Sequence, residues 1–168
     1  VRRMLELPEG SLTVGHVGRF NYQKNHPFLL RAFAAVRRQE PGAVLLLVGD
    51  GSDRPAAETL ARELHISDSV RFLGIRTDIP DLLQAMDVFA FPSHFEGLSV
   101  ASVEAQAAGL PCVISDKITK QAQITDLIKY ESLDAPLENW VDDIEQSLLI
   151  KRSDYLGTIQ NAGYDVCE

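Results

Sequence analysis

Cysteine is scarce in this sequence: the 168 residues contain only Cys112 and Cys167, and neither has a second cysteine at CxxC spacing. Disulfide-stabilised folds and structural zinc sites need several cysteines or histidines at short, regular spacing. The four histidines are scattered and form no such pattern. Cys112 lies in an apolar run, where we expect a buried and inert thiol. The sequence therefore predicts neither a disulfide framework nor a metal site.

Long apolar runs are also absent. The longest, such as residues 43–48 and 88–91, are far shorter than the ~20 residues that span a bilayer. The start of the chain has no basic segment followed by an apolar one and a cleavage site, as a secretory signal would have. We therefore expect a cytoplasmic protein.

A net positive charge is confined to the first part of the chain. Residues 1–38 carry seven Lys/Arg and two Asp/Glu, a net charge of +5, whereas the remainder carries −13 of the total of −8. General nucleic-acid binding needs a broad basic surface that neutralises phosphates, so we expect no nucleic-acid partner. One local basic segment is compatible with a small anion bound at a single site.

Short apolar runs alternate with helical patterns along the whole chain, which predicts an α/β fold with a parallel sheet. We expect one Rossmann-like, doubly wound domain over residues 1–168, with helices on both faces of the sheet. Ligands of such sheets bind beyond the carboxyl ends of the strands, here residues 18–26, 49–53, 74–78, 92–99 and 115–122. The expected strands are 12–17, 43–48, 69–73, 87–91, 111–115 and about 130–133, and the expected helices are 25–40, 55–64, 79–86, 100–108, 137–150 and 154–162.

The first predicted strand is followed by a turn with one glycine and two cations, Gly18, Arg19 and Lys24. A nicotinamide-binding fold would place a G-x-G-x-x-G pattern here. An arginine fork and a lysine point charge suit phosphate oxygens, so the turn favours a nucleotide diphosphate. Solvated loop charges are an equally valid interpretation of these two residues taken alone.

The loop at residues 92–99 precedes a predicted helix and offers a second anion site. Gly97 would let a ligand approach the backbone, Ser99 is a natural N-cap, and free amides at a helix start attract anions. Glu104 lies in the second turn of an otherwise small and apolar helix and points back toward that start. A half-buried carboxylate needs a partner, for which a ribose diol and a nearby arginine are the two candidates.

Two other residues at this edge have open roles. His94 lies at the mouth of the predicted site, but a loop histidine more often packs or is solvated than catalyses. Asp50 lies between Gly49 and Gly51 in a tight turn, where it could either cap the turn or contact ligand.

Together these motifs resemble the family 4 retaining glycosyltransferases of GT-B architecture, specifically their C-terminal, donor-binding half. The resemblance rests on a G-R-x4-K pattern at Gly18, Arg19 and Lys24, and on the E-x7-E spacing of Glu96 and Glu104. Other stretches of the sequence resemble those of capsular and exopolysaccharide members of this family. Such members lead us to expect Pro and Glu where this chain has Thr119 and Gln121, which loosens the subfamily placement.

The resemblance implies a role for each matched position. The donor would be a nucleotide diphosphate sugar, UDP-linked, and transfer would retain configuration without a metal or other cofactor. An N-terminal domain outside this sequence would hold most of the polysaccharide or lipid-linked acceptor, and the full enzyme could lie at the inner membrane face. The implied residues are Arg19, Lys24, Gly97, Leu98 and Ser99 for the diphosphate, Glu104 for the ribose, Ile75 and Arg76 for the base, and Glu96 as the catalytic carboxylate at the donor sugar.

Two other classes of function remain open. A degenerate or regulatory nucleotide-binding module would lack transfer, although the four charged motif residues are intact. A nucleotide-sugar epimerase half would share the architecture, although the E-x7-E placement disfavours it.

Overall fold

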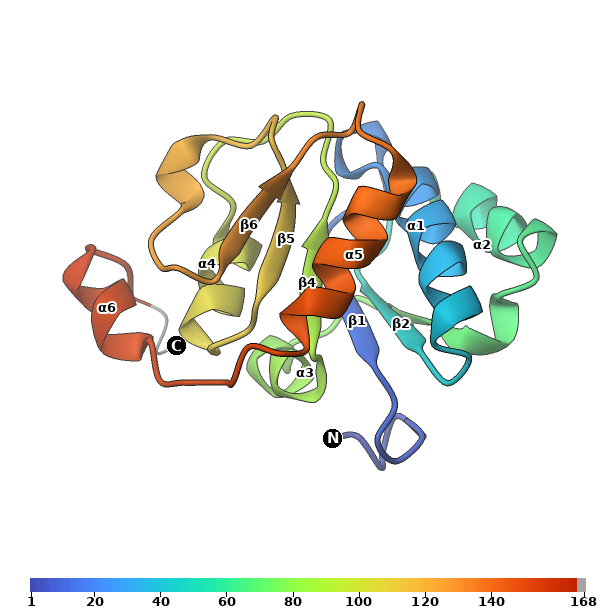
Figure 1. Cartoon of the computed structure of the whole chain (residues 1–168), viewed down its shortest axis with the longest axis horizontal. Helices are drawn as coiled ribbons and strands as arrows, with labels where there is room; N and C mark the ends of the chain where they lie inside the picture. Colours follow the sequence, from blue (N-terminus) through green and yellow to red (C-terminus); the bar gives the residue numbers. More distant parts are fainter. Residues whose placement is uncertain (166–168) are drawn as a thin grey trace.

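The computed structural model describes residues 1–165, which form one six-stranded parallel sheet in the order β3-β2-β1-β4-β5-β6 (Figure 1). This confirms the predicted Rossmann-like fold. The strands are β1 (Thr13–Val17), β2 (Val44–Val48), β3 (Val70–Gly74), β4 (Val88–Phe91), β5 (Cys112–Ser115) and β6 (Ile128–Glu131).

Helices cover both faces of the sheet (Figure 1). Pro occupies the first turn of three of them, where its missing N–H costs no hydrogen bond. The helices are α1 (His26–Gln39), α2 (Arg54–Glu63), α3 (Ile79–Ala85), α4 (Val100–Ala107), α5 (Leu137–Ser147) and α6 (Leu156–Asn161), with short 3-10 turns η1 (Tyr22–Lys24), η2 (Ser67–Ser69) and η3 (Lys120–Ala122).

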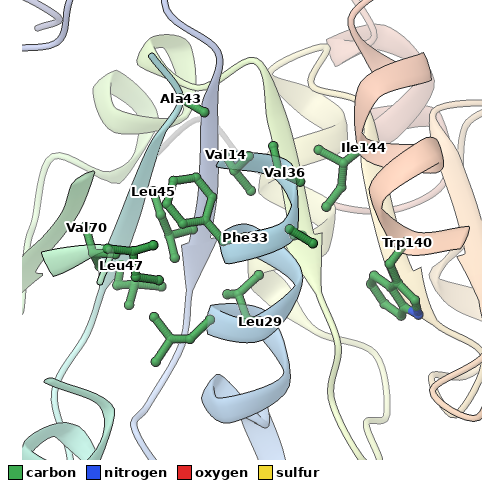
Figure 2. Packing of buried hydrophobic residues seen from close by; sticks show 14 of the residues in the cluster. Val14, Leu29, Phe33, Val36, Ala43, Leu45, Leu47, Val70, Trp140 and Ile144 are labelled. Atoms are coloured by element: carbon green, nitrogen blue, oxygen red, sulfur yellow. The ribbon is translucent and has the colours of Figure 1, made fainter. Parts of the chain in front are cut away.

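Alternating strand side chains divide the core into two clusters. On one face, Leu45 and Leu47 of β2 pack against Phe33 of α1, with Trp140 of α5 in the same cluster (Figure 2). On the other face, residues of β2, β4 and β5 pack against α3 and α4. Because both faces are covered, β2 is apolar and buried along its entire length.

The strand order reverses at β1, whose neighbours β2 and β4 lie on opposite sides. In doubly wound sheets, the crevice at this reversal, beyond the carboxyl ends, is where ligands bind. The loops that follow β1 and β4 carry Arg19, Lys24 and Glu96. The fold therefore brings the predicted diphosphate and sugar residues to one edge.

Some local expectations differ from the structure. Ser99 precedes α4 as expected, but its side chain makes no capping hydrogen bond. The last strand begins two residues earlier than predicted, because Ile128 pairs with Cys112 of β5. Cys112 is buried, and burial raises the pKa of its thiol, as expected for an inert thiol. Cys167 lies outside the described residues.

No helix within residues 1–165 combines the length and the apolar composition that crossing a membrane requires.

Candidate functional site

The loop after β1 is fixed to the loop after β2 by backbone hydrogen bonds. Gly18 N donates to Val48 O at 2.9 Å, and Phe20 N donates to Asp50 O at 3.1 Å. Arg19, between these two anchors, is exposed, and its guanidinium has no hydrogen bond or ion pair within residues 1–165. The backbone at Arg19 is therefore held in place while its cation remains free for an external anion.

The two glycines around Asp50 are required by this close approach. A Cβ on Gly49 would lie 2.2 Å from Gly18 O, and one on Gly51 would lie 2.4 Å from Phe20 O. Both also have positive φ, 130° and 157°. Asp50 Oδ1 accepts the amide hydrogen of Gly51 at 2.8 Å, so in this structure the aspartate caps its own turn.

Lys24 and Glu96, which are 72 residues apart, form an ion pair at the centre of the edge. Lys24 Nζ donates to Glu96 Oε2 at 2.7 Å, and the two side chains are only 15% and 11% exposed. Ser93 Oγ donates to the same oxygen at 3.2 Å, and the Phe91 ring lies 4.9 Å from Nζ. The structure therefore places the predicted diphosphate lysine and the predicted catalytic carboxylate in direct contact.

The loop after β4 is joined to the first loop on both sides of that ion pair. Asn25 Nδ2 donates to Pro92 O at 3.1 Å, and His94 N donates to Gln23 O at 2.9 Å. The His94 ring stacks on Tyr22, with centroids 4.3 Å apart. These contacts join the two loops into one surface. Within that surface, the His94 ring packs against Tyr22.

Free backbone amides lie beside the ion pair. The amides of Gly97, Leu98 and Ser99 donate no hydrogen bond within the described part of the chain. Gly97 and Leu98 are exposed, and a Cβ on Gly97 would meet no atom within 4 Å. Open space in front of free amides at a helix start is the arrangement that binds phosphate or carboxylate.

Glu104 is half-buried in the second turn of α4, and burial raises the pKa of its carboxyl group. Its carboxylate has no hydrogen bond or ion pair to any residue within 1–165, so the arginine partner considered above is not present. It lines a cleft of about 320 Å³ between α3 and α4, together with Thr77 and Pro80. A hydroxyl-bearing ligand in this cleft could supply the missing hydrogen bonds.

The two residues expected near the base have different surroundings. Ile75 is 82% exposed. Arg76 makes a bidentate pair with Asp78, at 2.8 and 2.6 Å, which raises the pKa of the guanidinium and lowers that of the carboxyl. The pair uses Nε and Nη2, so a contact from the Arg76 side chain to a base would use Nη1 or the face of the guanidinium.

Two histidines lie buried beneath the first loop. Burial lowers the pKa of His16 to about 4 and that of His26 to about 2, so both are neutral near pH 7. His16 Nδ1 pairs with Ala90 O at 2.9 Å, while its Nε2 and both His26 nitrogens lack partners. Residues 1–165 contain no group of three or more His, Cys, Asp or Glu arranged to hold a metal ion.

Sequence reasoning missed two supporting residues. Ser93 holds the Glu96 carboxylate, and a serine three residues before it was the available signal. Gln106 is fully buried in α4, where its amide oxygen accepts hydrogen bonds from Thr125 and from the amide of Ile124. This side chain fixes α4, and therefore its free N-terminal end, against the loop that follows β5.

The chain is similar to several known proteins. Residues 1–147 match the family described as Glycosyl transferases group 1. The chain is 39% identical over 158 residues to the putative glycosyltransferase EpsF of Bacillus subtilis, covering 92% of this chain and 41% of that protein. It is 34% identical over 117 residues to an Escherichia coli UDP-Gal:alpha-D-GlcNAc-diphosphoundecaprenol alpha-1,3-galactosyltransferase, covering 68% and 30% of the two chains.

Among solved structures, Anabaena Alr3699/HepE in complex with UDP has the same fold, with a TM-score of 0.74 and 23% identity over 95% of this chain and 49% of that one. The present chain thus spans less than half the length of each of these proteins.

Proposed function

Because the chain belongs to the Glycosyl transferases group 1 family, we propose that it forms the donor-binding half of a retaining glycosyltransferase. The observation that carries the proposal is the convergence at one sheet edge of a free cation, a lysine–carboxylate pair, free amides and an unpaired carboxylate. Arg19, Lys24 and the amides of residues 97–99 suit a diphosphate. Glu104 suits a ribose diol, because an ionised carboxylate accepts two hydroxyl hydrogens.

A UDP-linked sugar is the proposed donor. The names of two related proteins support it: the Escherichia coli galactosyltransferase has a UDP-sugar in its name, and HepE was solved with UDP and with UDP-glucose. The uracil would lie beside Ile75 and Arg76, next to the cleft that contains Glu104. The transferred sugar would lie at Glu96, beyond the diphosphate.

Transfer would retain configuration without a metal. The acceptor hydroxyl oxygen forms a bond to the anomeric carbon on the face from which the diphosphate leaves. The bond from that carbon to the phosphate oxygen breaks, and the hydroxyl proton passes to the departing diphosphate. Arg19, Lys24 and the free amides would stabilise the negative charge that accumulates on the leaving group.

The proposed domain organisation follows from the length of the relatives. Residues 1–168 would be one donor domain, and the remainder of a longer protein would hold most of a polysaccharide or lipid-linked acceptor. That longer protein would act in the cytoplasm at the inner face of the membrane, where lipid-linked acceptors are accessible.

The direct test is to measure nucleotide binding and sugar transfer on the same chain. We predict that UDP binds this chain with a dissociation constant nearer ~1 mM than ~1 μM, because the remainder of the longer protein would supply one wall of the proposed cleft. Transfer should be undetectable, because orienting the acceptor contributes roughly 7–11 kcal/mol to lowering such barriers. Supplying the remaining half in the same polypeptide should restore both.

The other outcomes of this experiment separate the alternatives. Binding without transfer in the full-length protein would indicate a nucleotide-binding module. Release of a free epimerised sugar would indicate an epimerase. Robust transfer by these 168 residues alone would show that the acceptor site is not where we propose.

Metal independence has its own test. We predict that UDP affinity is the same in the presence of a chelator and of added Mn²⁺, since cations of the protein would neutralise the diphosphate. An affinity that rises with Mn²⁺ concentration would contradict this part of the proposal.

A further inference from the structure

A second pocket lies on the opposite face of the sheet from the Glu104 cleft, between η1 and the first turns of α1 and α2. Its volume is about 220 Å³, and its lining includes Asn21, Tyr22, His26, Asp53 and His94. The proposed function above leaves this pocket without a ligand.

His26 forms part of the inner wall of this pocket. The side chain is 1% exposed, lines the pocket and has no hydrogen-bond partner on either ring nitrogen. The Phe20 ring stacks on it at 3.9 Å, and the His16 ring packs edge-on at 4.8 Å, so its orientation is fixed. Both ring nitrogens are buried beneath the surface of the pocket, so His26 contributes a fixed aromatic wall and not a hydrogen bond to a ligand.

The remaining lining favours an uncharged, hydroxylated ring. Tyr22 is 70% exposed and stacks face to face on His94, which provides a flat aromatic surface beside the cavity. Asn21 and Asp53 add an amide and a carboxylate, and no lysine or arginine lines the pocket. A phosphate would therefore meet no cation here. A single ordered water occupies only about 30 Å³, so one water would not fill the space.

The position of the pocket indicates which sugar it would hold. His94 is two residues before Glu96 in the same loop, and Tyr22 is two residues before Lys24 in η1. The pocket therefore adjoins the proposed transfer centre from the side opposite the nucleoside cleft. We infer that it binds a sugar unit of the acceptor, with Tyr22 and His94 as the stacking surface and Asn21 and Asp53 as the hydroxyl partners. This inference rests on the proposed function.

The test uses this chain labelled with ¹⁵N and titrated separately with UDP and with three methyl glycosides, those of glucose, galactose and N-acetylglucosamine. At least one glycoside should shift backbone amide resonances within residues 25–27 and 53–57, which UDP should leave unchanged, whereas UDP should shift those within 97–104. Tyr22→Ala removes the stacking surface, and Ala56→Trp fills the pocket from an exposed position on α2. Each should weaken glycoside binding at least about fivefold, equivalent to about 1 kcal/mol.

The matched control is Tyr22→Phe, which keeps the ring and should bind the glycoside within about twofold of the parent. UDP affinity should be unchanged in all three variants. The inference is overturned if no glycoside shifts these amides, if the shifts occur at residues 97–104 instead, or if Tyr22→Ala and Ala56→Trp bind like the parent. In each case retained UDP binding would leave the proposed function standing, whereas loss of UDP binding in the parent chain would refute both.

Discussion

Glu96 and Glu104 are eight residues apart, one in the loop before α4 and one in its second turn, yet their surroundings are opposite. Glu96 is 11% exposed and is held by Lys24 and Ser93. Glu104 is half-buried without a partner, and burial raises the pKa of its carboxyl. One carboxylate is therefore satisfied before any ligand arrives, and the other is not.

This contrast separates structural from binding roles within one motif. A diphosphate that approaches Lys24 must compete with Glu96 for the same ammonium group, so part of the binding energy is spent on that exchange. A ribose that approaches Glu104 displaces only water and relieves an unfavourable burial. We therefore expect mutations at the ion pair to affect both folding and binding, and mutations at Glu104 to affect binding alone.

The largest predicted effect is that of Lys24→Met. It leaves the carboxylate of Glu96 poorly compensated, and removing one partner of a mostly buried pair costs about 2 kcal/mol of unfolding free energy. For a chain of this length the melting temperature should fall by about 4–8 °C. UDP affinity should fall as well, because the cation is also a phosphate ligand.

The double variant Lys24→Met/Glu96→Gln is the control for that prediction. It removes both charges, so it should regain at least half of the lost unfolding free energy while UDP binding stays weak. A single variant that melts at the parent temperature would show that the ion pair adds nothing to stability.

Arg19→Ala should affect binding alone. Its guanidinium is exposed and has no partner in the described residues, so unfolding should not change. Charge-assisted hydrogen bonds contribute roughly 1.5–3 kcal/mol, so UDP affinity should fall about ten- to hundredfold. Arg31→Ala, at an exposed position in α1, changes the net charge equally and should leave UDP affinity unaltered; equal losses for both variants would mean a nonspecific charge effect.

Glu104→Gln has the smallest predicted effect and the sharpest ligand dependence. UDP affinity should fall about tenfold, because a neutral amide accepts hydroxyl hydrogens less strongly, whereas pyrophosphate affinity should not change. Equal losses for the two ligands would indicate a structural role.

The melting temperature of the Glu104→Gln variant is a second measurement, and the raised pKa of Glu104 gives the direction of the expected change. Because burial raises the pKa of Glu104 in the folded chain, the folded state holds this proton more tightly than the unfolded state does. The contribution of the carboxyl to stability therefore decreases as pH rises from the pKa of Glu104 in the unfolded chain through its raised pKa in the folded chain. Near pH 7 the Gln variant should melt at or slightly above the parent temperature.

Much of the fold could be predicted from the sequence, because strands buried on both faces appear in it as short apolar runs, such as the one that forms β2. Arg19, Lys24, Glu96 and Glu104 could be placed at one edge because parallel strands align their carboxyl ends. Pairwise contacts could not be predicted in this way. The Lys24–Glu96 pair forms because β1 and β4 are neighbours in space. The sequence does not show this, since the two residues lie 72 positions apart.

The local hydrogen bonds and ion pairs of polar side chains could not be predicted from the sequence either. Ser99 has the composition of an N-cap, but its side chain makes no capping bond. Gln106 lies in a helix that looked small and apolar apart from Glu104, yet its buried amide fixes that helix to residues 122–125. Arg76 stays a predicted base contact, and its bidentate pair with Asp78 is an interaction that the sequence did not indicate. Each outcome depends on which polar groups the folded chain brings together.

The most direct test of the donor site is to map where UDP binds, by titrating the ¹⁵N-labelled chain and following its backbone amides. The account predicts that the largest shifts fall in three loops at the carboxyl edge, residues 18–24, 74–78 and 96–104, with the β6 and α5 amides unaffected. Saturable shifts elsewhere, or none at millimolar UDP, would contradict it.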